Sequence, residues 1–321
     1  MAHLVLLNAG GTISAEAGPG GVLRGSAGPA VLAQSLPTTA LPVREVGVYR
    51  GLSEDMSYAD VSGLLDALSL ATADPEARGV VVAHGTDTLE ESAFLADLMH
   101  GSDTPVVFTG AQRAPGALGF DGQVNLMDAL TVAGSDAGRG LGAVIVFAGR
   151  ILAARHARKR RTTAPDAFAA DGGDIGRVSG GEVQLFARPV RSPSLDFKGL
   201  DPTVEIVTAG LGASCRLLDL LVENGARGVV LQALGRGNVG RPLVAATARA
   251  VAAGCVVVVV SRSDEGGVAP EYEAGRRLAD AGALFCGRLD AAKARLALAC
   301  LLAQGLDHDG VAAALKLYSF A

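Results

Sequence analysis

Short apolar runs of strand length recur along this chain and alternate with longer segments of helical spacing. The runs cover residues 3–7, 79–83, 105–109, 142–148, 204–208, 228–234 and 255–261. Segments with helical periodicity lie between them, at 88–100, 214–225 and 241–254. Continuous apolar strands separated by helices are typical of a parallel sheet that is covered on both faces. We therefore predict an α/β fold with right-handed crossover connections.

A polar, proline-containing stretch interrupts this alternation at residues 186–202. Its sequence, FARPVRSPSLDFKGLDP, contains three prolines and has no helical period. Stretches of this kind connect domains, and 321 residues are enough for two domains. We predict an N-terminal α/β domain with a parallel sheet over 1–188, a linker over 189–202, and a smaller α/β C-terminal domain over 203–321.

Charge and hydropathy exclude several classes of protein. The net charge of −5 argues against a general nucleic-acid binder, which needs a basic field. The chain shows no basic-then-apolar signal peptide, and no uncharged apolar run approaches the roughly 20 residues that span a bilayer. We expect a cytoplasmic protein with neither a membrane nor a nucleic acid as its partner.

The four cysteines lie in the last third of the chain, and none belongs to a Cys-x-x-Cys pair. Cys215, Cys255, Cys286 and Cys300 each stand beside apolar residues, which predicts buried free thiols in a reducing compartment. A zinc site needs closer spacing and nearby histidines. We predict neither a metal nor a cofactor.

Two of the predicted strands end in a glycine followed by a threonine. LVLLNAGGTIS reaches Thr12, and VVVAHGTDTLEES reaches Thr86 and Asp87. Ligands bind at the carboxyl ends of parallel strands, and a hydroxyl beside the N–H groups of a glycine turn suits an acyl-transfer nucleophile. A phosphate site at these two strand ends is excluded, because neither of them carries G-x-G-x-x-G or a Walker lysine. Thr88, with Glu91 three residues later, predicts a capping box at the start of the next helix.

A nucleophilic threonine needs a base, and the distribution of lysine suggests one. The 28 basic residues comprise four lysines and 24 arginines, and Lys159 stands within RHARKRRTT. Lysine can act as a base, whereas arginine does not lose its proton in proteins. The alternative interpretation of this segment is a solvated basic face.

In this order, NAGGTIS, HGTDTLEE and RKRRTT resemble the bacterial L-asparaginase family. LSEDM (52–56), TGAQR (109–113), DGQVNLMDAL (121–130), ALGRGNV (233–239) and GRLDAAKARLAL (287–298) extend the resemblance over nearly the whole chain. The resemblance implies a large and a small α/β domain in a homotetramer or homodimer with its sites between subunits. It also implies hydrolysis of L-asparagine to L-aspartate and ammonia without a cofactor, with minor glutaminase activity.

The resemblance also assigns roles to residues. It implies that Thr12 is the primary nucleophile and that Thr86, Asp87 and Lys159 form a second cluster in which Lys159 activates a hydroxyl or water. The remaining assignments concern substrate binding: Asp87 with Glu54 for the α-ammonium, Ser53 for the α-carboxylate, the Ala111 carbonyl for the amide nitrogen, and Asn238 for the neighbouring subunit's site.

The chain departs from the family pattern near Thr12. Val22 stands where the family has a tyrosine paired with that threonine, and Tyr49, Tyr58 and Tyr272 are candidates to replace it. Glu271 and Glu273 are candidates for a glutamate that reaches a neighbouring site, and Glu54 stands where many members have glutamine. The glycine-rich segment 14–28 is interpreted as a lid.

These departures leave two alternatives open. One is an amidohydrolase of the same fold that acts on another small amide. The other is an amino-acid-binding sensor that keeps Asp87 and Ser53 for a zwitterion while Thr12 is idle.

Overall fold

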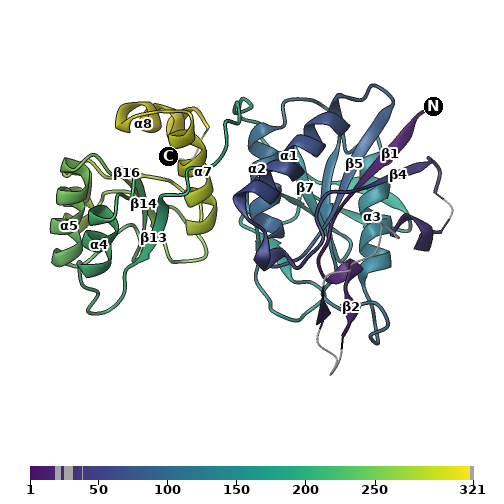
Figure 1. Cartoon of the computed structure of the whole chain (residues 1–321), viewed down its shortest axis with the longest axis horizontal. Coiled ribbons are helices and arrows are strands. Elements are labelled where there is room, and N and C mark those ends of the chain that lie inside the picture. Colours follow the sequence, from purple (N-terminus) through teal and green to yellow (C-terminus); the bar gives the residue numbers. More distant parts are fainter. Residues whose placement is uncertain (19–22, 25–31, 38, 319–321) are drawn as a thin grey trace. The chain divides into compact units, whose positions relative to one another are not determined.

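The computed structural model describes residues 1–18, 23–24, 32–37 and 39–318 of the chain. Internal contacts divide the chain into two units, Met1–Leu195 and Asp196–Ala321 (Figure 1). Residues 189–195 of the predicted linker pack on the first unit: the Leu195 N–H donates to the Leu98 carbonyl at 2.7 Å, and the Arg191 guanidinium donates to the His100 carbonyl. The first unit therefore extends past the last strand of its sheet.

An eight-stranded sheet forms the centre of the first unit, in the order β12-β11-β8-β7-β6-β5-β1-β4. Neighbouring strands from β7 to β4 pair in parallel. The strands are β1 (His3–Ala9), β4 (Val43–Gly47), β5 (Ala77–His84), β6 (Val106–Thr109), β7 (Ala143–Phe147), β8 (Arg150–Ala153), β11 (Gly176–Ser179) and β12 (Glu182–Leu185). The predicted α/β class is confirmed, and the apolar runs at 3–7, 79–83, 105–109 and 142–148 are strands of this sheet.

Strands β8, β11 and β12 are antiparallel, so the sheet is mixed and not wholly parallel as the sequence predicts. Two-residue turns connect antiparallel strands at this edge of the sheet. Ala148–Gly149 connects β7 to β8, and Gly180–Gly181 connects β11 to β12. All four turn residues have positive φ, from 50° at Ala148 to 79° at Gly181. Turns of this hand match the twist of antiparallel strands, and they replace the helical crossover that a parallel pair needs.

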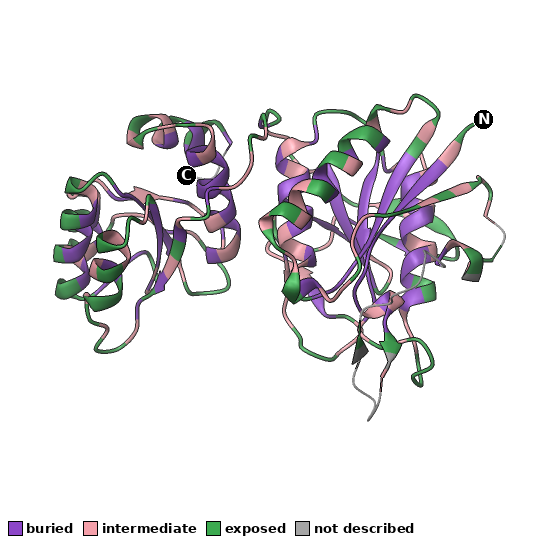
Figure 2. Cartoon of the chain, in the orientation of Figure 1, coloured by how far each residue is buried: buried purple, intermediate pink, exposed green. Residues whose placement is uncertain are grey.

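Helices cover both faces of the first sheet. α1 (Tyr58–Ala73) and α2 (Leu89–Met99) contact each other and lie on one face, and α3 (Gly122–Gly134) lies on the other (Figure 1). Alternate strand residues such as Leu4, Leu6, Val81 and Val144 form a core with α3. Figure 2 shows the central strands buried along their length, as expected for a sheet covered on both sides.

The second unit contains a four-stranded parallel sheet in the order β13-β14-β15-β16. α4, α5 and α6 pack on one face of this sheet and α7 on the other. The elements are β13 (Val204–Thr208), α4 (Arg216–Glu223), β14 (Gly228–Ala233), α5 (Arg241–Ala252), β15 (Val256–Ser261), α6 (Glu273–Asp280), β16 (Leu284–Phe285), α7 (Ala291–Ala303) and α8 (His308–Leu317). The strands predicted at 204–208, 228–234 and 255–261 are confirmed.

All four cysteines are free thiols. Cys255, Cys286 and Cys300 are buried, and burial raises their thiol pKa values to about 11, 12 and 12. Cys215 is only half-buried, so the prediction of burial is wrong at that position. The helices in the described segments all fall short of the length and hydropathy required to cross a membrane.

Candidate active site

Glycine contacts bring the ends of β1 and β5 together. Gly10 and Gly11 have φ of +73° and +81°, which favours glycine. A Cβ on Gly11 would lie 2.2 Å from the Gly85 Cα, and a Cβ on Gly10 would lie 2.4 Å from the Gly51 carbonyl oxygen. The Gly11 N–H donates to that same oxygen at 2.9 Å. Because no side chain fits at either position, the glycines allow the loop that carries Thr12 to lie against the end of β5.

Three of the expected site residues meet at the carboxyl end of β5, which we call the β5 tip; the carboxyl end of β1 is the β1 tip. The Lys159 Nζ donates to the Thr86 Oγ1 at 2.8 Å and pairs with the Asp87 Oδ1 at 2.6 Å. Thr86 is buried, whereas the Asp87 side chain is 58% exposed and can meet a ligand. Lys159 comes from β9 (Ala157–Lys159), which pairs with β10 (Phe168–Ala170) outside the main sheet. These contacts join three side chains, and their roles stay a prediction.

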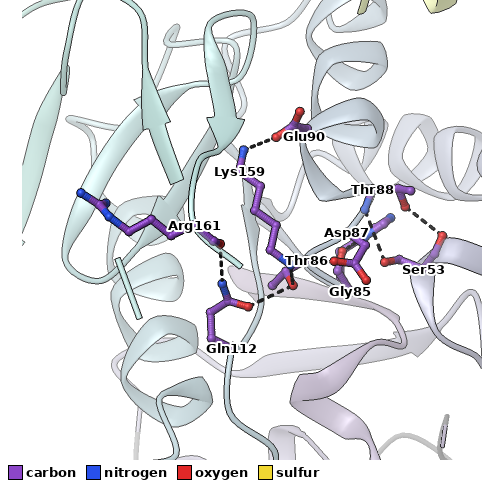
Figure 3. Close-up of polar contacts among 10 residues, drawn as sticks. Ser53, Gly85, Thr86, Asp87, Thr88, Glu90, Gln112, Lys159 and Arg161 are labelled. Carbon is purple, nitrogen blue, oxygen red and sulfur yellow. Dashed lines mark hydrogen bonds and ion pairs between the residues drawn. The ribbon is translucent and has the colours of Figure 1, made fainter. Parts of the chain in front are cut away.

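Gln112 completes the hydrogen bonds of Thr86, a role that local sequence does not predict. The Thr86 hydroxyl donates to the Gln112 Oε1 at 3.3 Å, and the Gln112 Nε2 donates to the Arg161 carbonyl at 3.4 Å (Figure 3). The Asp121 carboxylate accepts from the Gln112 N–H at 3.1 Å. Gln112 lies in TGAQR, which supported the resemblance, but nothing in local spacing points this amide at Thr86.

Glu90 is a second contact that the sequence did not reveal. Its carboxylate accepts a hydrogen bond from the Lys159 main-chain N–H (Figure 3). Glu90 stands in the first turn of α2, immediately after the tip. Lys159 is therefore held through its main chain by α2 and through its ammonium by the β5 tip.

The capping box predicted at Thr88 does not form. Thr88 occupies the N-cap position of α2, but its side chain makes no capping hydrogen bond. The hydroxyl instead donates to the Ser53 carbonyl at 2.9 Å (Figure 3). The same carbonyl also accepts from the Met56 N–H at 3.3 Å. The tertiary hydrogen bond to Ser53 takes the Thr88 hydroxyl away from the end of α2.

Ser53, Glu54 and Ala111 lie on loops that border the tips. Ser53 is buried and lies so close to Gly85 that a Cβ on the glycine would be 2.6 Å from the Ser53 Oγ. Glu54 follows it in the 3-10 helix η4 (Ser53–Asp55) and is exposed. Ala111 is fully buried just beyond β6. Their assignment to substrate stays a prediction.

The second unit holds Asn238, Glu271 and Glu273. Asn238 lies after β14, where its main-chain N–H donates to the Leu234 carbonyl at 2.8 Å. The two glutamates pair with arginines of the second unit, Glu271 with Arg236 and Glu273 with Arg277. The Arg236 guanidinium lowers the pKa of Glu271. The expected contributions of these residues to a neighbouring subunit stay predictions.

The segment after Thr12 is described only in part. Val22 and most of the proposed lid lie outside the described residues; within 14–28, β2 (Glu16–Ala17) and β3 (Leu23–Arg24) pair antiparallel. The Tyr49 hydroxyl donates to the Leu52 carbonyl at 3.2 Å. Burial, helped by nearby carboxylates, raises the pKa of Tyr49, so this phenol is protonated at neutral pH.

The described residues offer no group of three or more histidine, cysteine or acidic side chains arranged to hold a metal ion. The side chains that meet at the β5 tip are instead an ammonium, a carboxylate, a hydroxyl and an amide. An exposed carboxylate beside a hydrogen-bonded hydroxyl and lysine can bind an ammonium group and transfer protons. The arrangement therefore suits the binding of a cationic group and proton transfer.

Family models match both units of the chain. The model described as Asparaginase, N-terminal matches residues 3–191, and the model of the Glutaminase/Asparaginase C-terminal domain matches residues 203–315. The chain belongs to the asparaginase family.

Individual relatives cover almost the whole chain. A "Probable L-asparaginase" of Deinococcus radiodurans is 35% identical over 96% of this chain and 95% of its own length. An L-asparaginase of Bacillus licheniformis is 32% identical over 94% of this chain and 95% of its own. The crystal structure of a probable cytoplasmic L-asparaginase from Campylobacter jejuni matches with a TM-score of 0.87 and 26% identity, over 99% of this chain and all of that one. The fold is therefore that of an asparaginase from end to end.

Proposed function

We propose that this protein hydrolyses the side-chain amide of L-asparagine to L-aspartate and ammonia. The observation that carries the proposal is the Lys159–Thr86–Asp87 cluster, with the Lys159 Nζ 2.8 Å from the Thr86 Oγ1, at a tip that packs against the loop of Thr12. The relatives named L-asparaginases support this substrate.

The reaction has two steps. The Thr12 hydroxyl attacks the amide carbon and its proton passes to the amide nitrogen, so that the C–N bond breaks and ammonia leaves. The resulting aspartyl ester is cleaved by a water that Lys159 and Thr86 activate, which frees aspartate and restores Thr12. Gln112 holds the Thr86 hydroxyl during both steps through the 3.3 Å hydrogen bond.

Substrate binding uses the loops around the two tips. Asp87, which is exposed at the β5 tip, binds the α-ammonium together with Glu54, and Ser53 binds the α-carboxylate. The Ala111 carbonyl accepts from the amide nitrogen. The carboxylate of Glu54 adds negative charge near the ammonium, and we expect only minor activity on L-glutamine.

Family membership also supports a proposal for the assembly and location of the protein. We propose a cytoplasmic homotetramer or homodimer in which Asn238 reaches the neighbouring subunit's site. Sedimentation of the purified protein tests the assembly, and a monomer that is fully active would contradict it.

One observation favours a second function, that of an amino-acid-binding sensor. Within residues 1–18, 23–24, 32–37 and 39–318, no side chain hydrogen-bonds to the Thr12 hydroxyl, and Val22 replaces the family's tyrosine. Without a proton acceptor, Thr12 would be idle while Asp87 and Ser53 still bind a zwitterion.

The test is ammonia release from L-asparagine and L-glutamine by the wild type, Thr12→Ala and Lys159→Met. We expect sustained release from asparagine by the wild type, none from Thr12→Ala, and at most one equivalent per site from Lys159→Met. Lys198→Met, which changes an exposed lysine paired with Asp196, is the matched control and should match the wild type. Calorimetric binding of aspartate without ammonia release would establish the sensor instead.

A further inference from the structure

His84 is a buried histidine that the proposed reaction does not use. It is the last residue of β5, directly before Gly85 and Thr86, and its side chain is fully buried. Its ring lies 6.3 Å from that of Phe108, centroid to centroid, at an angle of 50°. A histidine in this position needs an explanation, because leucine or phenylalanine would fill the space with no polar atoms to satisfy.

The two ring nitrogens of His84 have unequal surroundings. The Nδ1 lies 2.8 Å from the Gly85 carbonyl oxygen. Because a carbonyl oxygen only accepts, the Nδ1 must carry the proton. The Nε2 is buried and has no hydrogen-bond partner among the described residues. Burial lowers the pKa of His84 to about 4, so the ring is neutral at pH 7 with the Nε2 unprotonated. The ring therefore makes one hydrogen bond, through the Nδ1, while its Nε2 has none among the described residues.

That hydrogen bond fixes a peptide plane at the tip. Gly85 has no side chain, and a Cβ there would lie 2.6 Å from the Ser53 Oγ, which leaves no room for one. A glycine carbonyl is otherwise free to rotate, since glycine tolerates many backbone conformations. The Gly85–Thr86 peptide is trans, so the Thr86 N–H points opposite to the Gly85 carbonyl. Holding the carbonyl at the ring therefore directs the Thr86 N–H away from the ring.

The Thr86 N–H has no acceptor among the residues that the structure describes. It belongs to the residue whose hydroxyl contacts Lys159 and Gln112, at the tip that packs against the loop of Thr12. A fixed N–H without a partner suits the negative oxygen that develops when an amide carbon is attacked. Its direction depends on the Gly85–Thr86 peptide plane.

We propose that His84 is a positioning residue that fixes the Gly85–Thr86 peptide through its Nδ1–H, so that the Thr86 N–H is aligned for the transition state. This inference rests on the proposed hydrolysis of asparagine. It predicts that His84 contributes to kcat more than to KM, because the aligned N–H matters most when charge develops on the substrate oxygen.

Two substitutions of nearly equal shape separate this role from simple packing. His84→Asn removes the ring but keeps an N–H donor at the position of the Nδ1, whereas His84→Leu puts a methyl group there. Both leave a similar void against Phe108. We expect kcat for asparagine to fall about 10- to 100-fold in His84→Leu, with KM changing less than about threefold. His84→Asn should recover most of kcat.

His100→Leu is the matched control, because it removes another buried histidine of the first unit. The His100 Nε2 donates to the Thr104 carbonyl at 2.8 Å, in the loop after α2. It should lower stability while leaving kcat at the wild-type value. Circular dichroism and thermal unfolding would establish that each variant is folded before kinetics are compared.

The outcomes are distinct. Equal losses of kcat in His84→Asn and His84→Leu would overturn the proposal, because the void alone would then explain them. A rise in KM with kcat unchanged would also overturn it. A wild type that releases no ammonia contradicts the proposed function instead, and the two failures are therefore distinguishable.

Discussion

The two threonine tips of the first unit are built differently. At the β5 tip, side chains hold the hydroxyl: Thr86 accepts from Lys159 at 2.8 Å and donates to Gln112 at 3.3 Å. At the β1 tip, the main chain holds the loop, through the contacts of Gly10 and Gly11, and no side chain of the described residues hydrogen-bonds to the Thr12 hydroxyl.

This difference separates two tasks. A hydroxyl fixed by a lysine and an amide is preorganised for proton transfer before the substrate binds. The Thr12 hydroxyl belongs to a residue that is held only through its main chain, so its side chain can rotate toward a substrate, as an attacking group must. The β5 tip therefore supplies proton transfer, and the β1 tip supplies the nucleophile.

Gly11→Ala should separate the tips. The new Cβ would lie 2.2 Å from the Gly85 Cα, and φ of +81° disfavours alanine even without that clash. We expect a loss of about 3–5 kcal/mol in the free energy of unfolding of the first unit and severe loss of activity.

Gly172→Ala serves as the control for Gly11→Ala. Gly172 has φ of +92°, and no atom lies within 4 Å of a Cβ built there, so only backbone strain of about 1 kcal/mol should remain. Urea unfolding followed by circular dichroism measures both variants. Equal losses would show that the contact between Gly11 and Gly85 contributes little.

Acid should destabilise the β5 tip, because His84 becomes protonated. The residue paired with His84 in β1 is Ala9, which cannot titrate, so the β1 tip has no such response at that position. The folded-state pKa of His84 is about 4, below the unfolded value of about 6.5. The contribution of neutral His84 to the free energy of unfolding is fully present above pH 6.5. It is lost as the pH falls toward 4, by about 3 kcal/mol in total. The difference in unfolding free energy between the wild type and His84→Leu should shift by that amount across this window. A constant difference would contradict the prediction.

Thr88→Val gives the smallest effect. It keeps the shape of the side chain but removes the 2.9 Å hydrogen bond to the Ser53 carbonyl, which ties the β5 tip to a proposed substrate loop. We expect a loss of about 1 kcal/mol in stability and a severalfold rise in KM for asparagine.

Thr72→Val is the matched control for Thr88→Val. The Thr72 hydroxyl donates within α1, to the Leu68 carbonyl at 3.0 Å, so its loss should leave KM unchanged. If KM stays the same in both variants, the link between Thr88 and Ser53 does not support substrate binding.

The sequence predicts the strands of this fold better than its edge. Valine-rich runs such as 79–83 and 255–261 identify buried strands, because a strand that is buried on both faces carries few polar residues. The antiparallel edge depends on β8, β11 and β12, which are only four residues each, and on turns such as Gly180–Gly181. Those segments are too short to stand out from the surrounding sequence as periodic strands.

The site shows the same limit. Strand-end motifs place Thr12 and Thr86 at one edge of the sheet, because parallel strands share that edge. Lys159 lies 72 residues from Asp87 in sequence. Its place at the β5 tip is predicted by the family resemblance of the chain and not by spacing. Gln112 and Glu90 were missed because their contacts, to Thr86 and to the Lys159 N–H, arise only when distant loops meet.

The most direct test of the two-tip account is to locate the ester formed during turnover. Lys159→Met, mixed with L-asparagine and quenched in acid, would be digested and its peptides weighed by mass spectrometry. The account predicts an aspartyl ester on Thr12, together with one equivalent of ammonia per site. An ester on Thr86, or continuing ammonia release with no ester on either threonine, would contradict the division of labour between the tips.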